Sequence, residues 1–133
     1  MIIITGASGM VGGNLVRALL AQGRPVRALV HHDHRALDNL DVETITADLT
    51  DPTSLRQAFA GAETVYHLAG SISIRMDNWE EAKQVNVEGT RNVVEVCLHC
   101  GVRRLIYFSS IHAYQQDPLD QILDENRPLV AGE

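Results

Sequence analysis

The chain has 133 residues, of which 45% are hydrophobic and 21% charged, and its formal net charge at pH 7 is −6. This length and composition predict one globular domain with a hydrophobic core of its own. The acidic balance and the absence of any Lys/Arg run argue against a nucleic-acid-binding protein. We expect no membrane segment, because no apolar stretch is long enough, and no signal peptide precedes the first strand, so a cytoplasmic location is expected.

The first dozen residues predict a strand, a tight turn and a helix. Residues 2–4 are a β-branched run, and Gly6, Gly9 and Gly12 follow at a spacing of three. An apolar stripe at helical spacing comes next, formed by Val11, Leu15, Val16, Leu19 and Leu20. A helix N-terminus offers unpaired N–H groups to a phosphate, and glycines let a pyrophosphate approach the backbone. The alternative is that these glycines serve only a tight turn.

The rest of the chain alternates between predicted strands and helices. Further strands are expected at residues 26–30, 42–47, 63–68 and 103–109. Helices are expected after the glycine turn, at 35–40, from Pro52 to Gly61 with Asp51 as N-cap, and at 78–99. Residues 71–77 look irregular, and Gly89 within the last helix suggests close packing or a kink. Trp79 and the apolar positions of that helix are expected in the core.

This alternation predicts an α/β fold, a Rossmann-type doubly wound parallel sheet with strand order 3-2-1-4-5. No sixth strand follows, so the fold is expected to be truncated after the fifth strand. We assign residues 1–114 to an NAD(P)-binding Rossmann domain and 115–133 to a polar loop or tail, with at most one helical turn, leading to a missing C-terminal half.

The cysteines and histidines give no metal site by their spacing. Cys97 and Cys100 form a Cys-Leu-His-Cys sequence, but no second cysteine pair supplies the remaining zinc ligands. We therefore expect two reduced structural cysteines. His67 and His112 are expected to be packing or loop residues without a chemical role.

Five motifs in order resemble the extended short-chain dehydrogenase/reductase family, and most of all its dihydroflavonol-reductase-like and nucleotide-sugar epimerase groups. They are Thr5-Gly6-x-x-Gly9-x-x-Gly12, Asp48-Leu49-x-Asp51, His67-Leu68-Ala69-Gly70, Val85-Asn86-Val87-x-Gly89-Thr90 and Phe108-Ser109-Ser110. The resemblance runs through Tyr114.

The resemblance implies a role for each motif. The pyrophosphate would bind at Gly6, Gly9 and Gly12 with the amides of Ser8, Met10 and Val11. Asp48 and Leu49 would contact adenine, Leu68, Ala69 and Gly70 would line the cofactor groove, Asn86 would tie a helix to the fourth strand behind the active site, and Ser110 would be the catalytic serine. Residue by residue, Asp48 could instead be a turn residue, Asn86 a buried structural amide and Ser110 an ordinary strand-end serine.

The end of the second strand bears on the choice between NAD and NADP. NAD-dependent relatives tend to carry an acid there for the ribose hydroxyls, whereas this chain has Val30 followed by His31. His31 and Arg35 are candidates for a 2′-phosphate, which favours NADP weakly, while Asp33 keeps NAD open.

The family's catalytic Tyr-x-x-x-Lys pair is absent from these 133 residues, because Gly70, Ile111 and Pro118 stand four positions after the three tyrosines. We therefore expect the dinucleotide-binding half of an NAD(P)-dependent oxidoreductase or nucleotide-sugar epimerase/dehydratase-like enzyme. The small-molecule substrate would belong to the full-length parent, and this chain would bind cofactor without turnover. The alternative is a stand-alone, non-catalytic NAD(P)-binding or sensor module. The fifth strand would form a sheet edge, so we expect a homo-oligomer or a tail that covers it.

Overall fold

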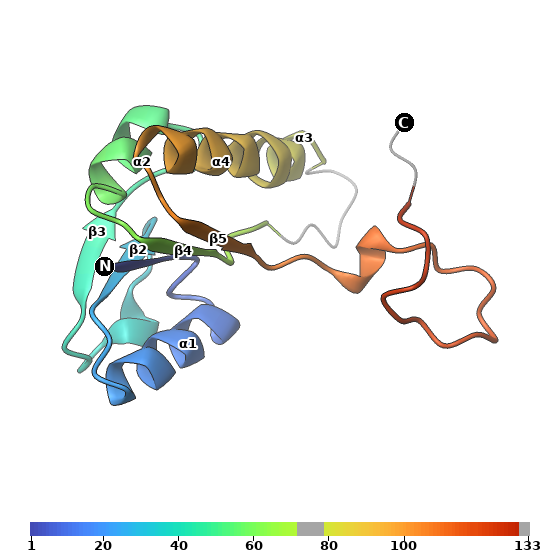
Figure 1. Ribbon diagram of the computed structural model, residues 1–133, viewed down its shortest axis with the longest axis horizontal. Helices are drawn as coiled ribbons and strands as arrows, with labels where there is room; N and C mark the ends of the chain where they lie inside the picture. Colours follow the sequence, from blue (N-terminus) through green and yellow to red (C-terminus); the bar gives the residue numbers. More distant parts are fainter. Residues whose placement is uncertain (72–78, 131–133) are drawn as a thin grey trace.

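The computed structural model describes residues 1–71 and 79–130 and contains a five-stranded parallel sheet (Figure 1). The strands are β1 (Ile2–Thr5), β2 (Val26–Val30), β3 (Glu43–Thr46), β4 (Thr64–His67) and β5 (Arg104–Tyr107). Their order in the sheet is β3-β2-β1-β4-β5, and all four pairings are parallel. The predicted Rossmann-type sheet is confirmed.

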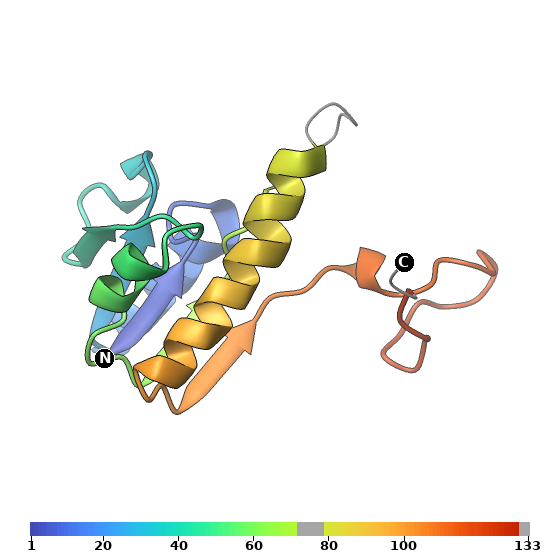
Figure 2. The ribbon, with the colours of Figure 1, turned by 90° about the horizontal axis from the view of Figure 1, so that it is seen from above.

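Helices cover both faces of this sheet. The helices are α1 (Met10–Ala21), α2 (Pro52–Ala58), α3 (Trp79–Lys83) and α4 (Gly89–His99), with a π-helical turn η3 (Gln84–Glu88) and the 3-10 turns η1 (Arg35–Leu37) and η4 (Ile111–Ala113). Helix α1 lies on one face, and α2 and α4 lie on the other (Figure 1). Figure 2 shows α3, η3 and α4 as one continuous rod, so the helix predicted at 78–99 is present. Within the described ranges, no helix combines the length and apolarity that a bilayer crossing requires.

Two apolar layers hold the helices to the sheet. Ile3 and Val65 pair in register across β1 and β4 and pack with Phe59 beneath α2 and α4. Ile4 and Val16 pack in the second layer, between the sheet and α1. All four residues of β1 are buried, as expected for the central strand of a sheet covered on both faces.

Local sequence signals placed most boundaries correctly. β2 spans the predicted residues, and the Asp51 side chain accepts a hydrogen bond of 2.8 Å from the Thr53 amide, which confirms the N-cap of α2. β3, β4 and β5 are each one to two residues shorter at their ends than predicted. The irregular loop predicted at 71–77 lies, apart from Ser71, outside the described residues.

The prediction that Trp79 belongs to the core is wrong. Its side chain is 67% exposed, and Val87 and Val94 are exposed as well. The rod starts beyond the edge of the sheet (Figure 2), so its first turn has no sheet beneath it. The core prediction holds for four other apolar positions of the rod, which are buried together with Gly89: Ala82, Val93, Val96 and Cys97.

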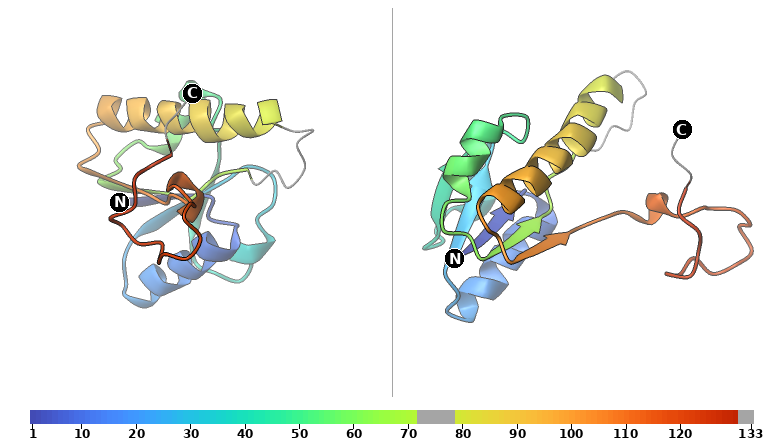
Figure 3. Two further views of the ribbon diagram at one scale, coloured as in Figure 1. Left: turned by 90° about the vertical axis from the view of Figure 1, so that its right-hand side faces the viewer. Right: turned by 45° about the horizontal axis from the view of Figure 1, so that its top comes forward.

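The segment after β5 leaves the domain and folds on itself (Figure 3). Tyr114 and Leu129 form an antiparallel bridge, and the Arg127 guanidinium donates to backbone carbonyls of residues 117, 118, 121 and 122. Residues 115–130, the described part of the tail, contain no helical turn; the 3-10 turn η4 ends just before them, at Ala113. The tail does not cover β5, whose Tyr107 stays 53% exposed. A homo-oligomer that covers this edge remains a prediction.

Gly89 is the point of closest approach between the helical rod and the loop after β3. A Cβ at position 89 would lie 2.9 Å from the Leu49 Cβ. The side-chain amide of Asn92 donates from Nδ2 to the Leu49 carbonyl at 2.9 Å. The close packing expected at Gly89 is therefore confirmed, and it holds Leu49 against the helix.

Replacement of Gly89 by alanine tests this contact, because the direction of the change in the free energy of unfolding shows whether the added methyl group clashes. Without a clash, Gly→Ala inside a helix stabilises a protein by about 0.5–1 kcal/mol, whereas overpacking costs about 1–3 kcal/mol. We expect Gly89→Ala to lower the free energy of unfolding in urea, and Glu95→Ala, on the exposed side of α4, to change it by less than about 0.5 kcal/mol. A stabilised Gly89→Ala protein would contradict the packing.

Candidate functional site

The turn between β1 and α1 presents an uncompensated helix N-terminus. Gly9 is the N-cap of α1, so no side chain caps the first amides, and the first turn contains no acidic residue. The first N–H groups of a helix have no intrahelical acceptor and carry partial positive charge. This end of α1 is therefore suited to an anion.

The three glycines of the turn have different surroundings. Gly6 has φ +67°, and a Cβ there would lie 2.6 Å from the Ala69 nitrogen. A Cβ on Gly12 would overlap the Gly6 carbonyl oxygen. A Cβ on Gly9 would meet only the Gly6 oxygen, at 3.3 Å, and Gly9 is exposed. Gly6 and Gly12 thus permit the chain to pack, while Gly9 leaves open space in front of α1.

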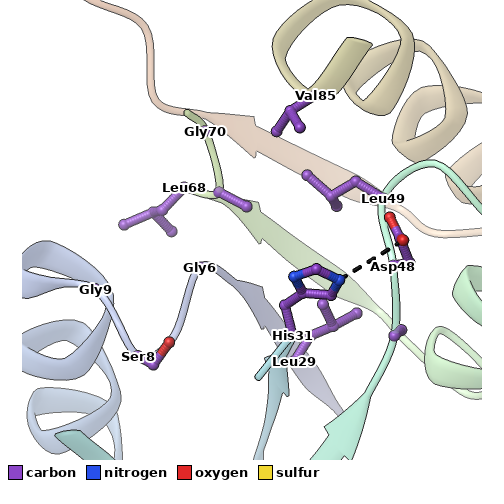
Figure 4. Close-up of a pocket in the computed structure, with 12 residues that line it drawn as sticks. Gly6, Ser8, Gly9, Leu29, His31, Asp48, Leu49, Leu68, Gly70 and Val85 are labelled. Carbon is purple, nitrogen blue, oxygen red and sulfur yellow. Dashed lines mark ion pairs between the residues drawn. The ribbon is translucent and has the colours of Figure 1, made fainter. Parts of the chain in front are cut away.

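A cavity of about 340 Å³ lies beside this turn, and we call it the glycine-turn cavity (Figure 4). Its walls come from the carboxyl ends of β1, β2, β3 and β4 and from η3. The lining residues are Gly6, Ser8, Gly9, Leu29, His31, Ala47, Asp48, Leu49, Leu68, Ala69, Gly70 and Val85. In doubly wound sheets ligands bind where the strand order reverses, which here is beside β1. Most of the predicted cofactor residues are therefore brought together.

Asp48 combines a turn role with a free carboxylate oxygen. Its Oδ1 accepts from the Thr50 amide and hydroxyl, both at 2.8 Å, and these bonds lower the pKa of the carboxyl. Its Oδ2 lies 3.7 Å from His31 Nε2 (dashed line in Figure 4). The turn interpretation is therefore correct, and the second oxygen is left on the side of the cavity.

The loop after β2 places its candidates differently. His31 lines the glycine-turn cavity and stacks on His32 with 3.7 Å between ring centroids. Arg35 pairs with Asp33 at 2.6 Å, is 85% exposed at its side chain, and is not among the lining residues. The Arg35 guanidinium holds the pKa of Asp33 well below its usual range. Roles for Arg35 and Asp33 toward a cofactor remain predictions.

A second cavity of about 450 Å³, the Ser110 cavity, lies on the other side of residues 68–70. It is lined by Val11, Leu68, Ala69, Gly70, Ser71, Asn86, Thr90, Tyr107, Phe108, Ser109 and Ser110. The Asn86 side chain accepts from the Ser71 amide at 2.7 Å and donates to its carbonyl at 2.8 Å. Asn86 thus ties the helical rod to the segment that follows β4.

Ser110 and Met10 are both exposed. The Ser110 hydroxyl oxygen accepts from the His112 amide at 3.3 Å, which caps η4 and matches the local-bonding alternative. Its position on the wall of the Ser110 cavity also leaves it open to a ligand. Met10 is the first residue of α1, is 83% exposed and lines neither cavity.

A row of buried, hydrogen-bonded polar side chains, which the sequence analysis did not predict, lies beneath these cavities. Thr5 and His67 are fully buried, and the Thr5 hydroxyl lies 2.7 Å from His67 Nδ1. The opposite ring nitrogen, Nε2, lies 3.1 Å from the Thr90 hydroxyl. His67 is a packing residue as expected, but it also joins β1, β4 and α4. A histidine near the end of the predicted strand 63–68 was the signal that could have indicated it.

The cysteines show no sign of a reactive or metal-binding site. Burial raises the pKa of the Cys97 thiol to about 11, which keeps it protonated at neutral pH. Within residues 1–71 and 79–130, no cluster of His, Cys, Asp and Glu has three members placed to hold a metal ion.

Comparison with known families identifies the arrangement. Residues 2–131 match the NAD dependent epimerase/dehydratase family. The chain belongs to this family. The expected relationship to extended short-chain dehydrogenase/reductases is thereby confirmed.

Individual relatives cover the chain well but are much longer. Sterol demethylase protein B of Methylococcus capsulatus is 45% identical over 118 residues, which are 87% of this chain and 36% of that protein. A putative dihydroflavonol 4-reductase of Synechocystis sp. is 39% identical over 112 residues, 83% of this chain and 32% of that protein. The chain therefore spans about a third of the length of these curated relatives.

A solved structure with cofactor has the same fold. A short-chain dehydrogenase/reductase superfamily protein from Agrobacterium tumefaciens with bound NAD superposes with a TM-score of 0.85 at 32% sequence identity. The superposition covers 100% of this chain and 40% of that chain.

Proposed function

We propose that the chain binds NAD(P) in the glycine-turn cavity, as the dinucleotide-binding half of an NAD(P)-dependent oxidoreductase or epimerase/dehydratase-like enzyme. The observation that carries the proposal is the convergence of an uncapped helix N-terminus, the open side of Gly9 and Asp48 on one cavity. NAD bound to the Agrobacterium relative supports it.

The residues present fit such a cofactor part by part. The amides of Ser8, Met10 and Val11, with the open side of Gly9, would hold the pyrophosphate. The Asp48 carboxylate would accept a hydrogen bond from the adenine amino group, and the neighbouring Leu49 amide would face the ring. Residues 68–70 would line the path towards the Ser110 cavity, where a nicotinamide would accept or donate hydride.

Ser110 can orient a substrate oxygen by a hydrogen bond, but it cannot supply the acid–base group of the reaction. In the family that group is a tyrosine followed four residues later by lysine, and the only lysine here, Lys83, has no tyrosine at that spacing. The full protein would act on a small molecule at a carbinol carbon. The 133-residue chain by itself would bind cofactor without turnover.

Gly9→Val is the first test of the binding site. The added side chain would fill the space in front of α1, so we expect cofactor affinity in calorimetric titration to fall at least about tenfold, the loss of about 1.4 kcal/mol. Ala18→Val, on the exposed side of α1, is the matched control. Gly12→Val should instead unfold the turn. A folded Gly9→Val protein with wild-type affinity would remove the site from this turn.

The second test concerns the choice between cofactors. NAD-dependent relatives tend to carry an acid at the end of the second strand, which would repel a 2′-phosphate. His31 lines the cavity in this region instead, so we expect NADP to bind more tightly than NAD. His31→Asp should reverse this preference, and His31→Ala should reduce it. His34→Ala, in the same loop but not among the lining residues, should leave it unchanged. Tighter binding of NAD by the wild-type chain would count against the proposal.

The third test is the absence of turnover. General acid–base catalysis contributes about 10² to 10⁴ in rate, and positioning of substrate contributes more. We expect the purified chain, screened by nicotinamide absorbance with alcohols, ketones and nucleotide sugars, to show none above background. The control is a longer protein in which further residues, encoded downstream and containing a Tyr-x-x-x-Lys pair, follow these 133 residues. Substrate-dependent turnover by the 133-residue chain would show that the catalytic acid–base group lies within these residues, contrary to the proposal.

A further inference from the structure

His67 is a polar side chain whose position in the fold is unexplained by cofactor contact. It ends β4, is fully buried, and lines neither cavity. Both of its ring nitrogens nevertheless have hydrogen-bond partners on other elements, Thr5 at the end of β1 and Thr90 on α4.

The hydrogen bonds around His67 have one consistent direction. The Ala69 amide donates to the Thr5 hydroxyl oxygen at 3.2 Å. Among the described residues, the other partner of the Thr5 hydroxyl is His67 Nδ1, so we infer that the hydroxyl proton is donated to Nδ1 and that this nitrogen carries no proton. Nε2 carries the proton of the neutral ring and donates to the Thr90 hydroxyl. A charged ring would need to donate from Nδ1 into Thr5 and would turn the Thr5 proton away from its acceptor.

This chain of bonds ends at the wall between the two cavities. Leu68, Ala69 and Gly70 line both the glycine-turn cavity and the Ser110 cavity. The Ala69 amide is held by Thr5, and Ser71, the next residue after the wall, is held by Asn86, one helical turn before Thr90. His67 is the link that joins these two anchors through the inside of the protein.

We propose that His67, as the neutral Nε2–H tautomer, is a positioning residue that fixes residues 68–70 between the cofactor and Ser110. The proposal rests on the proposed function, because its effect on binding is defined only if the cofactor occupies the glycine-turn cavity. His67 touches neither cofactor nor substrate and acts through Thr5 and Thr90.

The surroundings of the ring give the proposal a pH dependence. Burial lowers the pKa of His67 to about 4. Thr5 of β1 and Thr90 of α4 face the ring without charge, and on β5 the Tyr107 ring is 5.6 Å away; no charged side chain in the described residues shifts this pKa. Since the folded pKa lies below the unfolded value of about 6.5, the stability from neutral His67 is complete above that pH and is lost as the pH falls towards 4.

The binding experiment compares two substitutions of Thr90 in the full 133-residue chain. Thr90→Val keeps the shape but removes the acceptor of Nε2–H, and we expect NAD(P) affinity to fall about three- to tenfold, the size of one lost buried hydrogen bond. Thr90→Ser restores the hydroxyl and should restore affinity. Thr64→Val, which removes a hydroxyl from the other end of β4, is the control and should bind as wild type. Circular dichroism establishes that each variant is folded.

Nitrogen-15 NMR of the histidine rings provides a readout that does not depend on cofactor. We expect His67 to be neutral with the proton on Nε2 from pH 7 down to about 5. A protonated Nδ1 in this range, or Thr90→Val binding as tightly as wild type, would overturn the inference. If the wild-type chain binds no cofactor, the proposed function fails, and the NMR result still decides whether the bonded chain exists.

Discussion

The close approach of two backbone turns, one after β1 and one after β4, is the constraint on which the site depends. A Cβ at Gly6 would lie 2.6 Å from the Ala69 nitrogen, and the Thr5 hydroxyl accepts from the Ala69 amide. In a parallel sheet these turns leave neighbouring strands at the same edge, and both line the glycine-turn cavity beside α1. Contacts between main-chain atoms, which adjust far less than side chains do, therefore fix this side of the glycine-turn cavity.

The helical rod provides the second support of the glycine-turn cavity. Gly89 lets α4 approach Leu49, Asn92 holds the Leu49 carbonyl, and Asn86 holds Ser71. Three positions within two turns of one helix thus fix the loop after β3 and the segment after β4. The π-helical turn η3 contains Asn86 and directly precedes Gly89. π-Helical turns recur at functional sites. Here the extra residue of the π-turn rotates the helix at the place where it contacts the loop after β3 and the segment after β4.

Much of this architecture could be predicted because its signals are local. The apolar run at 26–30 and the Asp51–Pro52 pair each specify their own element, and the motif order matched a known family. The bond between His67 and Thr90 could not be predicted, because it depends on how α4 lies across β4. Trp79 failed for the same kind of reason, since helical periodicity marks an apolar stripe but not where the sheet beneath it ends. The Arg35–Asp33 pair, two residues apart, was local enough to foresee.

The glycine turn shows why a motif is a poorer guide than its geometry. Its three glycines look equivalent in the sequence, yet Gly6 and Gly12 serve close contacts within the protein. Of the two that line the cavity, Gly6 and Gly9, only Gly9 could carry a Cβ without overlapping the backbone. The tight-turn interpretation therefore holds for Gly6 and Gly12, while the open side of Gly9 is the feature on which the proposed phosphate site rests. The same division holds at Asp48, where one carboxylate oxygen closes a turn and the other lies on the side of the cavity. Local structure and ligand recognition share residues here because the turns that end parallel strands are also the walls of the site.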